Sequence, residues 1–306
     1  MKKIKLFIDG KEGTTGLRIF ERVANRPELE ILTLPEEQRK DVAGRKQKIN
    51  ESDITILCLP DAGAIESVSL IENLMVKVID ASTAHRTADG WTYGFPELNG
   101  NQKELISKAK MVANPGCHAS GFIAVVAPLI QSGIVKKTDN LSCFSLTGYS
   151  GGGKKMIAEY ENAERDKLLD APRLYGLTQK HKHLKEMSFV TGLEKYPVFN
   201  PIVAPFYAGM AVTVPFDGVN ENIIYDALKT HYANSKFIKV EKADGFLSAG
   251  LKTGYDDMTL YVCGGEERVT VTAVFDNLGK GASGAAIQNL NIMLGLDETY
   301  GLKLGE

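Results

Sequence analysis

Short apolar runs alternate with amphipathic stretches through the first third of the chain. The apolar runs are "KIKLFID", "LEILTL", "ITILCLP" and "KVID", and the stretches between them include "LRIFERVAN" and "AIESVSLIENL". This alternation predicts parallel strands joined by helices. Runs that are apolar almost throughout are typical of strands covered on both faces. The pattern favours a Rossmann-like, doubly wound nucleotide-binding domain.

The pattern changes after residue 116. One apolar helical segment is followed by period-2 runs between glycine-rich turns: "LSCFSLTGYS", "GMAVTVPF", "LYVCGG" and "RVTVTAVFDN". These runs predict a mixed or antiparallel sheet in a second, α+β domain. The C-terminal "GASGAAIQNLNIMLGL" has helical spacing, and we expect it to pack back onto the first domain. The expected domains are therefore 1–116 with about 281–306, for nucleotide binding, and 117–280, for catalysis and oligomerisation.

Three glycines follow the first strand in "DGKEGTTGLRIFERV", spaced G-x-x-G-x-x-G ahead of a helix. Glycines there let the backbone approach a pyrophosphate, whose charge the helix N-terminus stabilises. Such glycines can also be purely conformational, but their place in the βαβ series favours nucleotide binding. The candidate residues are Gly10, Gly13, Thr14, Thr15 and Gly16.

The turn after the second strand, "PEEQRKD", bears on the type of nucleotide. No acid stands at the strand tip to bind a ribose 2′-hydroxyl, although Glu36 is at about the right distance. Arg39 and Lys40 suit the additional phosphate of NADP. A solvated charged turn is the alternative.

Composition and charge narrow the class of partner. Lys and Arg total 36 against 38 Asp and Glu, and no run of five like charges occurs. We therefore expect a small-molecule ligand, and neither a nucleic acid nor a membrane partner. The apolar run near the N-terminus stops at Asp9, which favours a cytoplasmic protein. The four cysteines are scattered without CxxC spacing, so we expect free thiols, no disulfide framework and no metal site.

Cys117 is the cysteine that the sequence singles out. It follows Asn114-Pro115-Gly116 and begins an apolar helix, where unpaired N–H groups and the helix dipole favour a thiolate. We expect Pro128 to kink or end this helix. The other cysteines, Cys58, Cys143 and Cys263, lie in strand-like runs and are interpreted as packing residues.

A nucleophilic thiolate normally works with an acid or base. Of the five histidines, His181 and His183 in "LTQKHKHLKEM" alternate within a polar stretch. On a strand or a helix the two rings point in different directions, so we expect only one to face the thiol. A structural role for the pair is the alternative.

Several motifs together resemble the N-acetyl-γ-glutamyl-phosphate reductases of the shorter variety. They are "GKEGTTG", "DASTAHRT", "YGFPELN", "ANPGCHASGF", "TGYSGGGK" and "RLYGLTQKHKHLKEM", and they span the chain in order. That family belongs to the glyceraldehyde-3-phosphate and aspartate-semialdehyde dehydrogenase superfamily. The resemblance implies NADP(H)-dependent reduction of an acyl phosphate to an aldehyde in arginine biosynthesis, by a homotetramer or homodimer. One departure is Asp9-Gly10, where many superfamily members have Gly-Ala.

The resemblance also implies roles for individual residues. Cys117 would form a thioester, with His183 as the preferred proton shuttle and His181 as the second choice. Arg86, Asn114, Ser150 and Gly151 would bind the substrate or its leaving phosphate. Glu186 would either orient His183 or bind substrate. The alternatives are an aspartate-semialdehyde dehydrogenase-like reductase, a non-catalytic NADP-binding sensor and a cysteine hydrolase on the same fold.

Overall fold

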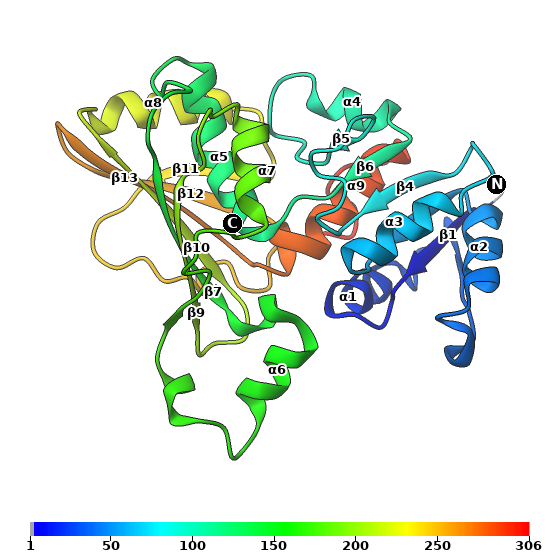
Figure 1. Cartoon of the computed structure of the whole chain (residues 1–306). Coiled ribbons are helices and arrows are strands. Elements are labelled where there is room, and N and C mark those ends of the chain that lie inside the picture. Colours follow the sequence, from blue (N-terminus) through cyan, green and yellow to red (C-terminus); the bar gives the residue numbers. More distant parts are fainter. Residues whose placement is uncertain (1–2, 306) are drawn as a thin grey trace. The chain divides into compact units, whose positions relative to one another are not determined.

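The structure, a computed structural model, describes residues 3–305, and its internal contacts divide the chain into two units (Figure 1). Unit 1 holds residues 3–95, 103–115 and 282–301. Unit 2 holds residues 96–102, 116–281 and 302–305. Positions 1, 2 and 306, at the ends of the predicted domain ranges, lie outside the described residues.

Unit 1 contains a parallel sheet with the strand order β2-β1-β3-β4-β6-β5. The chain leaves β1 for β2 on one side and then crosses to β3 on the other, so the sheet is doubly wound and has its switch point beside β1. The strands are β1 (Ile4–Asp9), β2 (Leu29–Leu32), β3 (Ile54–Leu57), β4 (Lys77–Asp80), β5 (Thr92–Tyr93) and β6 (Met111–Ala113).

The helices of unit 1 connect these strands or pack on them. They are α1 (Thr14–Val23), α2 (Val42–Glu51), α3 (Asp61–Ser69), α4 (Gln102–Lys108) and α9 (Gly284–Met293). All four residues of β3 are buried, as expected of a strand covered on both faces. The C-terminal helix α9 packs against α1 and β4.

Unit 2 contains a mixed sheet with the order β11-β12-β13-β10-β7-β9-β8, in which β7–β9 and β11–β12 are parallel. Its strands are β7 (Ser142–Gly148), β8 (Arg173–Leu174), β9 (Val198–Ala204), β10 (Met210–Asp217), β11 (Ile238–Lys242), β12 (Met258–Gly264) and β13 (Arg268–Phe275). Both sheets confirm the predicted fold class.

One face of the unit 2 sheet is covered by helices. Helix α5 (Cys117–Gln131) packs on β10 and β13 and against α7 (His183–Thr191) and α8 (Glu221–His231). On β7 the side chains alternate, with Ser145 buried beneath the helices and Phe144 about half exposed on the opposite face. A fourth helix, α6 (Gly153–Glu161), follows β7 in Figure 1.

Two details differ from the sequence-based expectations. Pro128 does not end α5, which continues to Gln131; the Ala124 carbonyl, four residues before the proline, accepts the Tyr232 hydroxyl at 2.7 Å instead of a helical N–H. Residues 96–102 and 302–305, assigned from sequence to the first domain, make their contacts in unit 2. There Lys280 pairs with Glu97, and the Lys303 N–H donates to Asp256.

Candidate active site

The glycine-rich turn after β1 needs two of its three glycines for steric reasons. Gly10 has a φ of +85°, and a Cβ there would lie 2.5 Å from the Cys58 carbonyl oxygen. A Cβ on Gly16 would lie 2.5 Å from the Gly10 carbonyl oxygen. At Gly13 the nearest atom would be 3.5 Å away, an ordinary van der Waals contact, so the fold itself does not exclude a side chain there. Gly13 therefore leaves room beside the backbone that a ligand can fill.

The start of α1 has the features of a phosphate site. The first intrahelical bond runs from the Leu17 N–H to the Gly13 carbonyl, so the N–H groups of Thr14, Thr15 and Gly16 precede the helix's own hydrogen bonds. Such groups, at the positive end of the helix dipole, stabilise an anion. Their position at the sheet's switch point is where dinucleotides bind in doubly wound folds.

A cavity of about 290 Å³ adjoins this turn at the carboxyl ends of β1, β2 and β3. Its lining includes Gly10, Gly13, Glu36, Arg39 and Lys40. Arg39 Nη1 donates to Glu36 Oε1 at 3.3 Å on the surface. The candidate ligand of a ribose hydroxyl and a candidate ligand of the 2′-phosphate are thus an ion pair. Arg39 and Lys40 stand together at this side of the cavity, and their charges suit the additional phosphate of NADP. The residues present therefore fit a dinucleotide.

The departure at Asp9 has a structural explanation. The Asp9 carboxylate is buried, and it accepts hydrogen bonds from Arg45 Nε at 3.2 Å and from the Ser67 hydroxyl at 2.8 Å. These donors come from α2 and α3, so the acid ties both helices to the end of β1. Its charge is offset within unit 1 and does not oppose an anion at the neighbouring turn.

Cys117 is the first residue of α5, with Gly116 as the N-cap. The Gly116 N–H donates to Glu186 Oε1 at 2.9 Å, and this carboxylate is buried. A Cβ on Gly281 would lie 3.0 Å from Cys117 Cβ, so a larger residue there would crowd the residue that carries the thiol. The Glu186 carboxylate, expected to act on His183 or on substrate, thus holds the turn that presents Cys117.

The two histidines of the H-K-H motif lie together, and the expectation that their rings diverge is wrong. Their ring centroids are 4.8 Å apart, and those of His181 and His183 lie 5.5 Å and 5.4 Å from the ring of His118. The reason is that His181 precedes α7, and its Nδ1 accepts the His183 backbone N–H at 3.2 Å. The bond folds the His181 ring back over the helix start.

Protonation of these rings follows from their burial. Burial, with a smaller contribution from Lys182, lowers the pKa of His181 to about 4. Burial, followed by the charges of His181 and Lys182, lowers the pKa of His118 to about 3. Both rings are therefore neutral near pH 7. Because Nδ1 of His181 already accepts a hydrogen bond, its proton is on Nε2.

Three side chains that sequence reasoning did not single out form a chain of hydrogen bonds beside Cys117. His118 Nδ1 lies 2.6 Å from Ser145 Oγ, and His118 Nε2 lies 2.7 Å from the Tyr175 hydroxyl. No local pattern brings them together, because they come from α5, β7 and the residue after β8. The adjacency of His118 to Cys117 was the one available signal.

The segment between Tyr175 and the histidines is fixed to β9 through Gln179. Its side-chain amide donates to the Phe199 carbonyl at 2.8 Å and accepts the Phe199 N–H at 2.9 Å. Gln179 has a φ of 55°, which is strained for a residue with a side chain. The two hydrogen bonds offset that strain, and the Phe199 ring packs against both His118 and His181.

Arg86 and Asn114 lie in unit 1, in the segments that follow β4 and β6. Arg86 Nε donates to the Asn114 carbonyl at 2.9 Å, and Nη2 donates to the Ala81 carbonyl at 3.1 Å. The Asn114 amide donates to the Ala282 carbonyl and accepts from Asn289. Both side chains hold the backbone that leads to Cys117. Their contact with substrate stays a prediction.

Ser150 and Gly151 lie in a short helical turn, Tyr149–Gly152, after β7. The Ser150 side chain is buried and accepts a hydrogen bond from Asn277 Nδ2 at 3.0 Å, whereas Gly151 is exposed. Asn277 also accepts the Gly209 N–H, so Ser150 belongs to a network that fixes this turn. Their role toward substrate also stays a prediction.

All four cysteines are free thiols. Burial raises the pKa of Cys58 to about 12, with smaller contributions from Asp80 and Asp9. Burial also raises the pKa of Cys143, and of Cys263 on the surface side of β12. These three thiols are therefore poor nucleophiles at neutral pH.

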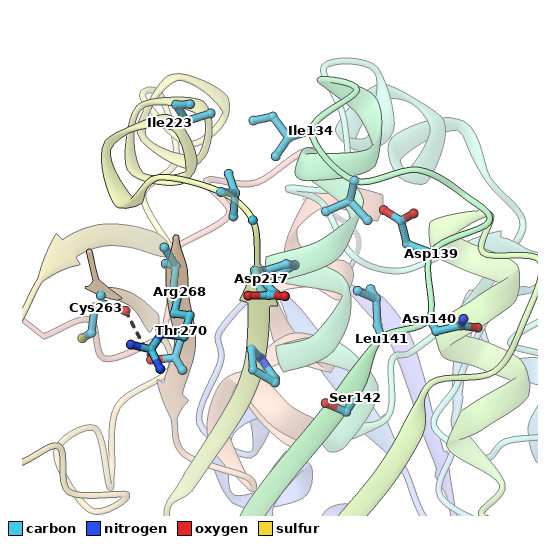
Figure 2. A pocket seen from close by; sticks show the side chains of 17 residues that line it. Ile134, Asp139, Asn140, Leu141, Ser142, Asp217, Ile223, Cys263, Arg268 and Thr270 are labelled. Carbon is cyan, nitrogen blue, oxygen red and sulfur yellow. Dashed lines mark hydrogen bonds between the residues drawn. The ribbon is translucent and has the colours of Figure 1, made fainter. Parts of the chain in front are cut away.

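A larger hollow of about 1260 Å³ lies in unit 2 at the ends of β7, β10, β12 and β13 (Figure 2). Asp139, Asp217 and Arg268 line it together with apolar side chains. None of the predicted site residues, all within the described chain, belongs to this lining. In residues 3–305, no helix is both long and apolar enough to span a bilayer.

Comparison with known proteins shows two family models and many relatives. Residues 5–106 match the model for the semialdehyde dehydrogenase NAD binding domain, and residues 117–277 match the semialdehyde dehydrogenase dimerisation domain. N-acetyl-gamma-glutamyl-phosphate reductase 2 of Nostoc sp. (strain PCC 7120 / SAG 25.82 / UTEX 2576) is 43% identical over 322 residues, covering 99% of this chain and 100% of that protein. N-acetyl-gamma-glutamyl-phosphate reductase of Rhizobium meliloti (strain 1021) is 44% identical over 307 residues, covering 95% and 99%.

Solved structures are similar in fold at lower identity. Aspartate semialdehyde dehydrogenase II from Vibrio cholerae, complexed with ASA, has a TM-score of 0.73 at 15% identity, covering 96% of this chain and 99% of that one. Aspartate semialdehyde dehydrogenase with NADP from Candida albicans has a TM-score of 0.69 at 15% identity, with coverage of 96% and 99%.

Proposed function

Because the chain belongs to the N-acetyl-γ-glutamyl-phosphate reductase family, we propose that it reduces N-acetyl-L-glutamyl 5-phosphate with NADPH. The products are N-acetyl-L-glutamate 5-semialdehyde and phosphate, a step of arginine biosynthesis. The observation that carries the proposal is Cys117 at the first position of α5, followed directly by His118, whose ring packs with those of His181 and His183.

The first step is attack by the Cys117 thiolate on the acyl carbon. The carbon–sulfur bond forms, the bond from that carbon to the phosphate oxygen breaks, and phosphate leaves a thioester on Cys117. The first turn of α5 supports this step, because its own hydrogen bonds begin only with the Ser120 N–H to the Gly116 carbonyl. The preceding N–H groups stabilise negative charge at the reacting carbonyl oxygen.

His183 is the residue that carries the proton. His181 uses Nδ1 to accept the His183 backbone N–H and stays neutral near pH 7, so it orients the helix start. His183 takes the proton from the Cys117 thiol to form the thiolate that attacks, and it returns that proton to the sulfur when the aldehyde leaves. Glu186, one turn along α7, holds the Gly116 N–H and so fixes the backbone before Cys117.

Unit 1 holds the cofactor in this proposal. Gly10, Gly13 and the start of α1 bind the pyrophosphate, and Arg39 with Lys40 binds the 2′-phosphate. Bound NADPH supplies the hydride that reduces the thioester to the aldehyde level. Arg86 and Asn114 fix the segment that ends at Pro115. The next residue, Gly116, is the N-cap of the helix that begins with Cys117.

An assay in the reverse direction tests the proposal. Phosphate-dependent reduction of NADP should proceed with N-acetylglutamate semialdehyde. Aspartate semialdehyde, which has a free amine, should lose at least roughly a hundredfold in kcat/KM, or about 2.7 kcal/mol. Replacing NADP by NAD should weaken cofactor binding at least about tenfold.

Two controls make the assay decisive. Cys117→Ser should abolish turnover, and Cys263→Ser should leave it unchanged, because that thiol lies at the far end of β12. Equal turnover of the two aldehydes would contradict the proposed substrate. Activity in Cys117→Ser would contradict the proposed thioester intermediate.

The proposal includes self-association through the uncovered face of the unit 2 sheet. That face carries the partly exposed apolar residues Phe144 and Val198, which are 48% and 57% exposed, and Leu174 at 57%. Phe144 pairs with Thr213 on β10 and with Asn200 on β9. Because Val198 lies two residues before Asn200 on β9, Val198 and Phe144 face the same side of the sheet. A second copy of the chain is the partner, in keeping with a family model for a dimerisation domain over residues 117–277.

A further inference from the structure

Two charged side chains that the proposed mechanism does not use form a buried ion pair in unit 2. Lys280 Nζ donates to Glu97 Oε1 at 2.9 Å and to Glu97 Oε2 at 2.8 Å, and the two side chains are 1% and 3% exposed. The ammonium group also lies 4.8 Å from the centre of the Phe237 ring. Glu97 belongs to the motif "YGFPELN", and Lys280 lies in the helical turn Gly279–Ser283 after β13.

The segment that carries Glu97 is fixed to two helices of unit 2. His231, at the end of α8, donates from Nε2 to the Glu97 carbonyl at 3.0 Å. The side-chain amide of Gln131, at the end of α5, donates to the Leu98 carbonyl at 3.1 Å. The position of Glu97 is therefore set by α5 and α8.

Lys280 ties the segment after β13 to Glu97. At the start of this segment, the Asp276 carboxylate accepts the Gly254 N–H at 2.7 Å. At its end, the Gly281 N–H donates to the Asp276 carbonyl at 3.0 Å. These two bonds close the turn and fix its first residue, and the Lys280 side chain joins the far end of the turn to the carboxylate of Glu97.

The residue after Lys280 packs on the proposed nucleophile. A Cβ on Gly281 would lie 3.0 Å from Cys117 Cβ, so the backbone there lies directly beside the first residue of α5. The hydrogen bonds within α5 begin with the Ser120 N–H, and the N–H groups before it stabilise a thiolate held at the helix start. The backbone of Gly281 thus limits the space into which the Cys117 side chain can turn.

An ion pair is not required at this place for stability alone. Taking two charges out of water costs about as much as their attraction returns, and apolar pairs of similar volume are often equally or more stable. A bidentate contact between charged groups nevertheless fixes direction and distance more closely than apolar packing does. The pair therefore suits the task of holding a backbone in one position.

We propose that Glu97 and Lys280 are positioning residues for Cys117, because their ion pair holds Gly281 against the first residue of α5. With Gly281 in place, the Cys117 side chain is confined to the start of the helix, beside the N–H groups of the first turn. The inference rests on Cys117 being the nucleophile of the proposed function. Neither charged side chain gives or takes a proton in this role.

The first test removes the pair in two steps and measures urea unfolding. Lys280→Met leaves the Glu97 carboxylate buried without its ammonium partner, so the unfolding midpoint should fall. Lys280→Met/Glu97→Met buries no charge, so the midpoint should return to the wild-type value or exceed it. This recovery shows that the double variant is folded before its thiol is measured.

The second test measures the initial rate of Cys117 alkylation by iodoacetamide at neutral pH, without substrate or cofactor. In the double variant the rate should fall at least roughly tenfold, because the thiol spends less time beside the N–H groups of α5. In the reverse assay kcat should fall by a similar factor, with KM for the aldehyde unchanged. A role in stability alone would instead restore both rates together with the unfolding midpoint.

Two further variants complete the experiment. Gly281→Ala keeps the ion pair but crowds Cys117, so it should also slow alkylation, and it decides the question if the double variant does not regain its stability. Arg26→Met/Glu28→Gln removes an ion pair of unit 1 whose cation is also buried, and it should leave the rate unchanged. A wild-type alkylation rate in the folded double variant, or in Gly281→Ala, would overturn the proposal. Alkylation involves no turnover, so it gives a result even if the proposed reduction fails.

Discussion

His118 is a buried side chain whose protonation couples to the stability of the whole chain. Burial lowers its pKa in the folded protein to about 3, against about 6.5 for an exposed histidine. The unfolded chain therefore binds a proton that the folded chain excludes between these two values. The stabilisation is complete above pH 6.5 and is lost as the pH falls toward 3.

Replacing His118 by glutamine should make the protein less sensitive to acid. The Gln amide can accept from Ser145 and donate to Tyr175, but it does not titrate. Between pH 7 and pH 5 the wild type should lose on the order of 2 kcal/mol more free energy of unfolding than His118→Gln. Urea unfolding at both pH values measures the difference. His231→Gln, at the partly exposed end of α8, is the control, and equal acid sensitivity of wild type and His118→Gln would contradict the assignment.

At the scale of elements, the three glycines of the turn from β1 to α1 have different roles. Gly10 and Gly16 are required by the fold, whereas Gly13 is available to contact a ligand. Gly10→Ala places a Cβ against the Cys58 carbonyl at a φ of +85° and should cost about 1–3 kcal/mol of stability. Gly13→Ala should change stability by less than about 1 kcal/mol, since nothing lies within 3.4 Å of its Cβ.

Gly13→Ala should nevertheless lower the affinity for NADP at least roughly tenfold, because the methyl group occupies the space in which the pyrophosphate would lie. Urea unfolding and calorimetric titration on the same two variants separate the effects. A Gly13→Ala protein that binds NADP as the wild type does would place the pyrophosphate elsewhere.

These elements also show how far the sequence alone leads. The strand–glycine–helix turn and the start of α5 at Cys117 are local, so spacing predicts them, and the βαβ rhythm predicts a parallel, doubly wound sheet. The row Ser145–His118–Tyr175 joins three segments far apart in the chain and has no local pattern. The predicted divergence of the His181 and His183 rings was wrong because it assumed that both residues lie in one regular element. His181 lies before α7, and its ring accepts a hydrogen bond from the first residue of that helix.

At the scale of the whole molecule, the mixed sheet of unit 2 has two unlike faces, one covered by helices and one that carries exposed apolar side chains. Alternation along β7 directs Ser145 beneath α5, where it contacts His118, and directs Phe144 to the uncovered face. A one-residue shift of register would exchange the two, so the Ser145–His118 contact and the exposed position of Phe144 depend on the same strand register. Exposed apolar side chains over several strands are costly in water, which favours covering them with a second copy.

Phe144→Arg should therefore reduce the mass of the particle in solution to that of one chain. The arginine would bring a charge into an apolar contact without a partner, which costs several kcal/mol at each copy. Size-exclusion chromatography with multi-angle light scattering measures the mass. Leu74→Arg, on an exposed loop of unit 1 where the leucine is 76% exposed, is the matched control and should keep the mass of the wild type. A wild-type protein that is already a single chain, or a Phe144→Arg protein of undiminished mass, would show that this face of the sheet is not where the copies meet.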